Sequence, residues 1–474
     1  MTSPPVHPPT RADDAGRAAS RPAGRPALRS VTRRRSGVDP ARVEAARSAT
    51  GTGEAVVGAV VLFTLFAGDF WRNLISWPGY FVLAGVLAVV CIVLVVRSRP
   101  RFRWRTTPKT LLLFLALALL SIAWSAYPGA SALGVLSSLL TAAGGVFLAL
   151  RLGWPGLLSA LGNAFRWILG LSLLFELVVA LFVRHPVLPL TPVKPIPSGT
   201  LPQAFYWSRD LLFHGGPIQG IVGNSNLLAM IALLSLIVFG IQVADRTVRR
   251  GSSVTWLVLA ALTLALTRSA TVIAAALVTA VVLGFALWAR RAGADRRTPV
   301  YVVGIALVAA TIVLVSVFAS RIPALFGKSE DLTGRLDIWA AVTKLAQQRP
   351  VFGWGWVSYW APWVKPFDGL ATRNGVEYLQ AHNAWLDVWL QLGIVGLVVF
   401  ILLVLTTFGR TWFLAIDRPR FTVADDQPYR ALTLLPLLLI AALIAQSFAE
   451  SRMLIEGGWA LLVTLAVATK RTAP

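Results

Sequence analysis

Long apolar segments recur along most of the chain and constrain the fold more than any other feature. We identify about twelve, at residues 55–73, 79–96, 110–126, 132–150, 165–183, 222–243, 254–268, 270–289, 299–320, 386–409, 431–449 and 452–469. Only 14% of the 474 residues are charged, whereas soluble domains average about 25%. Because about 20 apolar residues cross a bilayer as a helix, we expect a polytopic membrane protein.

The apolar segments predict helices and not the strands of a barrel. In lipid, only helices and closed barrels satisfy every backbone polar group. Barrel strands alternate apolar and polar residues, but runs such as 81–96 and 431–445 show no alternation. We therefore expect an all-α fold with about twelve transmembrane helices and a long extracytoplasmic loop that contains an amphipathic helix.

Basic residues predict the orientation of these segments. If the N-terminus is inside, every inside connection contains Lys or Arg; these connections are 97–109, 151–164, 244–253, 290–298 and 410–430. The outside turns near 73–78 and 127–131 contain neither. By the positive-inside rule both termini are expected in the cytoplasm. This topology accounts for most of the net charge of +23, so nucleic acid is not an expected partner.

Residues 1–50 differ from the rest of the chain. They are rich in Arg, Ala, Pro and Ser and lack an apolar period, which is typical of a disordered segment. No apolar core follows the first charges as it would in a signal peptide. We expect a disordered basic cytoplasmic tail at 1–50 and a polytopic membrane domain at 51–474.

Two long connections are expected on the outer side. Residues 184–221 contain seven prolines and predict an irregular loop. The large extracytoplasmic loop, 321–385, contains a helix pattern in which apolar residues recur every three or four positions, at Ile338, Trp339, Val342, Leu345 and Ala346. We expect Thr333 as its N-cap, Pro350 after its end, and the helix along the membrane interface.

The candidate site lies in residues 334–396, which include the longest polar interruption of the hydrophobic region. His382 is the first candidate because histidine is the usual general base near neutral pH. It lies where the outer loop re-enters the membrane, next to Asn383. A hydrogen-bonded interfacial histidine is the alternative interpretation.

Arginines on the outer side are the second set of candidates. They are Arg209, Arg268, Arg321, Arg335, Arg373 and Arg452. A guanidinium is permanently charged and binds phosphate oxygens through two parallel hydrogen bonds. Arg268 adjoins an apolar segment on each side, where a charge is costly; its alternative is a side chain that reaches the headgroups. Arg335 near a helix start is unfavourable for structure; its alternative is a solvated first-turn residue.

Aromatic residues are concentrated in the same loop: Trp354, Trp356, Tyr359, Trp360 and Trp363 fall within ten positions. Indoles stack on sugars, but they also anchor membrane proteins at the headgroup level, which is the default interpretation. Gly353 and Gly355 permit a close backbone approach to a ligand. No cofactor and no metal are expected, because the outer loops have no Asp-x-Asp and no His/Asp cluster with metal-ligand spacing.

Three motifs of the loop resemble the signature of the O-antigen ligase and polymerase superfamily of bacterial membrane glycosyltransferases. They are Gly334-Arg335-x-x-Ile338-Trp339, Pro350-x-x-Gly353-x-Gly355, and His382-Asn383 followed after nine residues by Gly393-x-x-Gly396. Weaker similarities are Trp124-Ser125 before a Pro turn, and Gly220 to Ala229 at the start of a middle segment. The resemblance covers about residues 120–410.

The resemblance implies transfer of a glycan from an undecaprenyl-diphosphate carrier to a glycan or lipid acceptor. The reaction would use no metal and would occur at the extracytoplasmic face of the bacterial plasma membrane. His382 would deprotonate the acceptor, and Arg335 and Arg321 would hold the diphosphate. Family members often have Ser-Arg between the seventh and eighth spans, whereas this chain has Arg268-Ser269, so Arg268 would act from a shifted position.

Other functions fit the same sequence. The sequence does not distinguish a ligase from a polymerase of this superfamily. A transporter or flippase of lipid-linked oligosaccharide predicts charged or broken helices at mid-membrane. Glu176 is the main carboxylate deep within a segment, and pairing with Arg166 is its simplest explanation. A non-catalytic envelope scaffold is the third hypothesis.

Overall fold

The computed structural model describes residues 51–100, 103–191, 201–248, 250–318, 330–373, 376–417 and 428–472. The chain divides into two units, 1–46 and 47–474, and all described residues belong to the second. The predicted tail at 1–50 and Arg321 lie outside the described residues.

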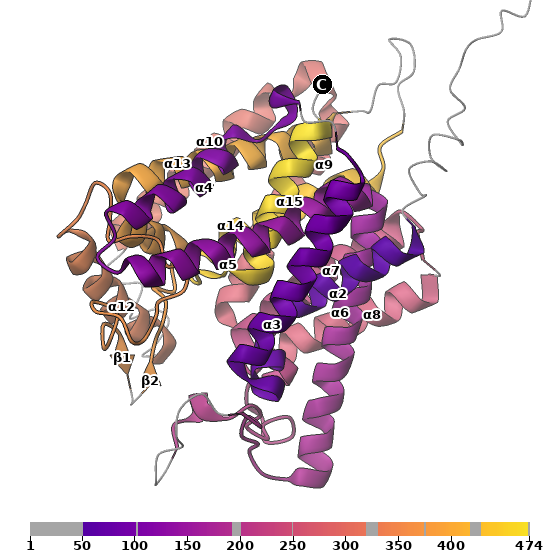
Figure 1. Cartoon of the computed structure of the whole chain (residues 1–474). Coiled ribbons are helices and arrows are strands. Elements are labelled where there is room, and N and C mark those ends of the chain that lie inside the picture. Colours follow the sequence, from indigo (N-terminus) through magenta and orange to yellow (C-terminus); the bar gives the residue numbers. More distant parts are fainter. Residues whose placement is uncertain are drawn as a thin grey trace, which may run out of the picture. The chain divides into compact units, whose positions relative to one another are not determined.

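Helices form nearly all of the regular structure, so the predicted all-α class is confirmed (Figure 1). They are α2 (Thr52–Phe66), α3 (Gly68–Arg97), α4 (Lys109–Leu120), α5 (Pro128–Phe147), α6 (Gly153–Val178), α7 (Ser225–Ala244), α8 (Arg250–Thr267), α9 (Ala270–Ala292), α10 (Thr298–Phe318), α12 (Glu330–Ala346), α13 (Ala384–Ile416), α14 (Leu435–Ser447) and α15 (Glu456–Thr472). The exception is a small antiparallel pair, β1 (Thr372–Arg373) with β2 (Val376–Glu377).

Five helical stretches among the described residues are long and apolar enough to cross a membrane. They are Gly68–Arg97, Pro128–Val183, Ser225–Ala244, Ala270–Ala292 and Ala384–Ile416. The stretch Pro128–Val183 contains two of the predicted segments. Five shorter apolar helices coincide with further segments, at Gly53–Phe66, Lys109–Ala123, Gly251–Thr267, Thr298–Leu314 and Ala431–Ser447. The count of twelve crossings stays a prediction.

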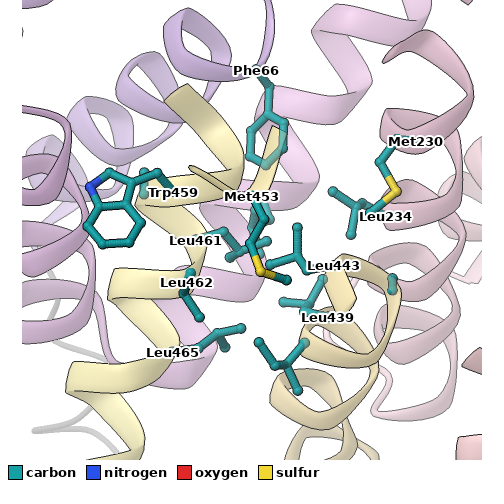
Figure 2. Close-up of a cluster of buried hydrophobic side chains, with 14 of the residues drawn as sticks. Phe66, Met230, Leu234, Leu439, Leu443, Met453, Trp459, Leu461, Leu462 and Leu465 are labelled. Atoms are coloured by element: carbon teal, nitrogen blue, oxygen red, sulfur yellow. The ribbon is translucent and has the colours of Figure 1, made fainter. Parts of the chain in front are cut away.

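The last helix packs inside the protein. Trp459 of α15 is 1% exposed, and its Nε1 donates to the Ser138 carbonyl of α5 over 3.0 Å. Gly145 of α5 lets the two helices approach closely, since a Cβ there would lie 2.6 Å from the Ala460 carbonyl oxygen. Figure 2 shows Met453, just before α15, among leucines of α14 and α15. This packing fixes the chain between α14 and α15 in place.

Helix α12 and the residues that follow it have a small apolar core of their own. Ile338, Val342 and Leu345 pack with Val357 and other buried residues of the loop, and α12 lies against α13. The face that was expected to meet lipid is therefore covered by protein. The predicted N-cap is also wrong, because α12 begins at Glu330 and Thr333 lies inside it.

Two of the clustered indoles are buried and not interfacial. Trp356 and Trp360 are each 1% exposed, and Trp360 stacks on Phe367 with ring centroids 5.6 Å apart. Trp363, by contrast, is 75% exposed. The membrane-belt interpretation is thus wrong for Trp356 and Trp360. The large apolar ring of an indole can pack in a protein core as well as at the headgroup level.

Candidate active site

Residues 350–355 lie against a break in α13 and form backbone hydrogen bonds with both sides of it. Gly393 has φ +66° and ψ −168°, which interrupts the helix. The amides after the break donate to the loop, Ile394 to the Pro350 carbonyl over 2.8 Å and Val395 to the Val351 carbonyl over 3.2 Å. In return, the loop amides donate to the carbonyls before the break, Trp354 to Leu390 over 3.1 Å and Gly355 to Gln391 over 2.9 Å. These four hydrogen bonds give backbone groups on both sides of the break partners in the loop.

Glycines allow this close approach. A Cβ on Gly353 would lie 2.5 Å from the Gln391 carbonyl, and a Cβ on Gly393 would lie 2.1 Å from the Val351 oxygen. A Cβ on Gly355 would lie 2.3 Å from Ser125 Oγ. The space around Gly353 and Gly355 is therefore filled by α13 and by the turn before α5, and the loop motif, Ser125 and Gly393 meet in one place.

His382 lies directly before α13 in a constrained position. Its φ is +49°, a left-handed conformation that is uncommon for a residue with a side chain. Asn383 caps the helix, because its Oδ1 accepts from Trp385 N over 3.0 Å and from Leu386 N over 3.2 Å. The cap and the left-handed residue together fix the direction in which the imidazole leaves the backbone.

Asp387 fixes the backbone at Ala381, the residue before His382. It is 1% exposed. Its Oδ2 accepts from Ala381 N over 3.0 Å and from the Ser451 hydroxyl, and its Oδ1 accepts from Trp360 Nε1 over 2.7 Å. Since a buried carboxylate needs such partners, the loop, α13 and the chain between α14 and α15 are joined at this point.

Glu450 lies at the centre of the candidate site. Its Oε2 accepts from His382 Nδ1 over 2.9 Å and from Gln380 Nε2 over 3.2 Å. Its Oε1 accepts from Arg335 Nη2 over 3.1 Å. The side chains of Glu450, His382 and Arg335 are only 8%, 15% and 11% exposed. One carboxylate thus brings together the predicted base and a predicted phosphate-binding arginine, which are 47 positions apart in sequence.

Electrostatics keep Glu450 ionised. Burial alone would raise its pKa, but the charges of His382, Arg335 and Arg452 and the hydrogen bond from His382 lower the pKa to about 2. An ionised carboxylate only accepts hydrogen bonds, so Nδ1 of His382 carries the proton. In the neutral ring Nε2 then has the free lone pair, which is the arrangement that a general base requires.

A second cluster of charged side chains lies close to Glu450. Arg72 of α3 pairs with Asp69 over 2.5 Å and with Glu456 of α15. Arg452 pairs with Glu456 over 3.1 Å and with Asp69 over 3.5 Å. Arg452 also lies close enough to lower the pKa of Glu450. The buried charges therefore extend from the start of α3 to His382.

Residues 255–401 match the sequence profile of the O-antigen ligase family. This match covers 147 of the 474 residues and supports the O-antigen ligase superfamily. No curated protein matches the chain. The O-antigen ligase segment contains Arg268, Arg335, His382 and the break at Gly393, whereas Glu450 lies outside it. The family and the apolar helices together support a bacterial membrane protein of cell-surface polysaccharide synthesis.

The remaining predicted residues of the O-antigen ligase segment lie at different places. Gly334 precedes Arg335 within α12. Arg268 has φ +51° between α8 and α9 and is exposed. Its Nη2 would lie 3.9 Å from a Cβ on Gly215. Within the described part of the chain, no recorded contact joins Arg268 to His382, Arg335 or Glu450.

Sequence reasoning missed Glu450, Gln380 and the role of Asp387. The available signal was the run Glu450-Ser451-Arg452, which interrupts the last two apolar segments. Adjacent charges between two spans are costly unless they have partners. That run therefore carried information that the loop motifs alone did not.

Proposed function

We propose that the protein transfers a glycan from an undecaprenyl-diphosphate carrier to a hydroxyl acceptor at the extracytoplasmic face, without a metal ion. The observation that carries the proposal is the buried contact of Glu450 with both His382 and Arg335. It places a base that can take a proton beside a cation that can hold phosphate. The basic inside connections support the assignment of this site to the outer side.

The chemistry follows from the two partners. Nε2 of His382 takes the proton of the acceptor hydroxyl as its oxygen attacks the anomeric carbon of the donor. The bond from that carbon to the diphosphate oxygen breaks, and its electron pair stays on the diphosphate. Arg335 stabilises this charge, an effect that is often the largest in catalysis. Among described residues its recorded side-chain bond is to Glu450 alone, which leaves further N–H donors for phosphate.

The donor supplies the energy of the transfer. Cleavage of a glycosyl diphosphate makes the reaction favourable without a nucleotide, which suits a site on the side where ATP is absent. A ligase and a polymerase differ only in the acceptor that presents the hydroxyl. The proposed chemistry is the same for both.

The transporter hypothesis receives less support. A broken helix is its expected hallmark, but the break in α13 is filled by residues 350–355. The simplest explanation of Glu176 was wrong: its Oε1 accepts from Gln219 N and Gly220 N over 2.9 and 2.7 Å. Arg166 instead donates to Gln242 over 2.5 Å. Glu176 therefore anchors the first outer loop and does not line a described passage.

The test replaces His382 by Gln and Arg335 by Gln in separate variants. We expect loss of glycan transfer and accumulation of lipid-linked donor in the cell, measured by mass spectrometry of lipid extracts and surface glycans. The control is His185→Gln, because His185 is an exposed histidine of the first outer loop. Wild-type transfer by His382→Gln, expressed at the control's level, would refute the base assignment.

A further inference from the structure

An apolar groove lies beside the loop that fills the break in α13. It is a cavity of about 450 Å³, lined by Trp124, Arg349, Pro350, Val351, Phe352 and Gly353. Val351 and Phe352 are 48% and 53% exposed. This exposed apolar pair begins two residues after Arg349 and lines the cavity, so a ligand or another surface can cover it.

The walls of the groove are held in place. Trp124 Nε1 donates to the Phe352 carbonyl over 3.0 Å, and the two rings pack edge to face with centroids 5.7 Å apart. The backbone of Pro350 and Val351 accepts from the amides after the break in α13. Trp389 Nε1 also donates to the Pro350 carbonyl over 3.3 Å. The groove is therefore preformed, which lowers the cost of ordering it around a ligand.

Arg349 supplies a cation at this groove. Its guanidinium lies over the Trp354 ring at 4.4 Å. Its recorded polar contact is one long bond of 3.5 Å to the Trp124 carbonyl. Within the described residues it forms no ion pair, unlike Arg335 and Arg452. A guanidinium fixed by stacking, with free donors, is suited to a phosphate group.

The position of the groove points to a membrane lipid. Trp124 directly follows the apolar helix at Lys109–Ala123, and the loop is bonded to α13, a candidate membrane span. Indoles at the ends of such helices are typical of the headgroup level. There a cation meets lipid phosphates and an apolar surface meets the first carbons of the acyl chains.

We propose that this groove binds an anionic glycerophospholipid of the surrounding bilayer. Arg349 contacts the headgroup phosphate, and Val351, Phe352 and Trp124 contact the acyl chains. Because Pro350 and Val351 also close the break in α13, the bound lipid stabilises the loop that joins α12 to the candidate active site. The site does not depend on the proposed transfer reaction.

The test titrates the full-length protein in detergent with phosphatidylglycerol and, separately, with phosphatidylcholine, and follows bound lipid by native mass spectrometry. We expect phosphatidylglycerol to bind more tightly than phosphatidylcholine. Arg349→Gln should weaken phosphatidylglycerol binding about fivefold, the effect of one cation at a lipid surface. Lys344→Gln is the matched control, since Lys344 is an exposed cation of α12, which ends three residues before Arg349, and Arg349→Lys should retain most of the binding.

Several outcomes would overturn the lipid site. Equal phosphatidylglycerol binding by Arg349→Gln and Lys344→Gln would do so. So would displacement of phosphatidylglycerol by equimolar undecaprenyl diphosphate, which would assign the groove to the donor. If Arg349→Gln does not fold, Phe352→Ser in the wild-type background should weaken the binding of both phospholipids, and unchanged binding by this variant would also refute the proposal.

Discussion

Glu450 accepts hydrogen bonds from His382, Arg335 and Gln380 at one buried point. A buried charge is costly unless it is paired, and removing one partner of such a group usually costs more than the pair gains. The carboxylate has two effects here: it fixes the tautomer of His382, and it neutralises Arg335 while the donor is absent. A diphosphate that reaches Arg335 must therefore compete with Glu450 Oε1.

Replacing Glu450 by Gln should lower the transfer rate by about 10²–10⁴-fold, because the amide no longer enforces the proton on Nδ1. The measurement is the initial transfer rate in membranes with matched protein content; a wild-type rate would remove Glu450 from the mechanism.

The lowered pKa of Glu450 also predicts acid sensitivity. Its pKa falls from the ordinary 4.5 to about 2, through the charges that offset burial. The ionised form is therefore favoured by folding, and this stabilisation is present above pH 4.5 and lost as the pH falls toward 2. Thermal midpoints of the purified protein at pH 6, 4 and 3 should fall less steeply for Glu450→Gln than for the wild type. Parallel slopes would show that the Glu450 contacts are absent in solution.

At the scale of elements, the break in α13 joins three parts of the chain. In an unbroken helix, the carbonyls before Gly393 would accept from amides of the helix itself. Residues 350–355 would then lack these backbone partners. At the break, these helix groups form backbone hydrogen bonds with the loop instead. The loop is therefore fixed to α13 by backbone hydrogen bonds, as paired β-strands are fixed to each other. The helix start at Asn383, which positions His382, is in turn fixed relative to the residues after Arg349.

Gly393→Ala should destabilise the protein by about 2–4 kcal/mol, because the new Cβ meets the Val351 oxygen at 2.1 Å and the residue has φ +66°. The matched control is Gly409→Ala in the same helix, where a Cβ meets nothing within 4 Å. That substitution should be neutral or stabilising by about 0.5–1 kcal/mol. Thermal midpoints in detergent measure both. Equal midpoints for the two variants would mean that the break is not retained.

At the scale of the whole molecule, hydropathy predicted the helices because the apolar runs are local. The loop motifs likewise predicted that His382 and Arg335 act together. The sequence did not predict Glu450, which lies 68 positions after His382, because pairing over that distance depends on how α14 and α15 pack. It also misplaced Trp356 and Trp360, since an indole run does not distinguish a small protein core from a membrane surface. Arg268 and Arg335 looked equivalent in sequence, but only Arg335 reaches the carboxylate.

The buried charges at the starts of α3 and α15 connect the N-terminal and C-terminal parts of the membrane domain. Arg72 is 7% exposed and depends on Asp69 and Glu456. Glu456→Gln removes one of these carboxylates, so we expect a loss of about 3–5 kcal/mol, the usual cost of an uncompensated buried charge. Lys344→Gln is the control, because Lys344 is exposed, and substitutions of exposed residues usually change stability by about 0.5 kcal/mol or less. Adding Arg72→Met to Glu456→Gln should recover part of the loss, because it removes the unpaired charge. The measurement is the thermal midpoint of each variant. If the change in the double variant equals the sum of the changes in the two single variants, Arg72 and Glu456 do not interact, and the electrostatic link between the two ends of the domain is absent.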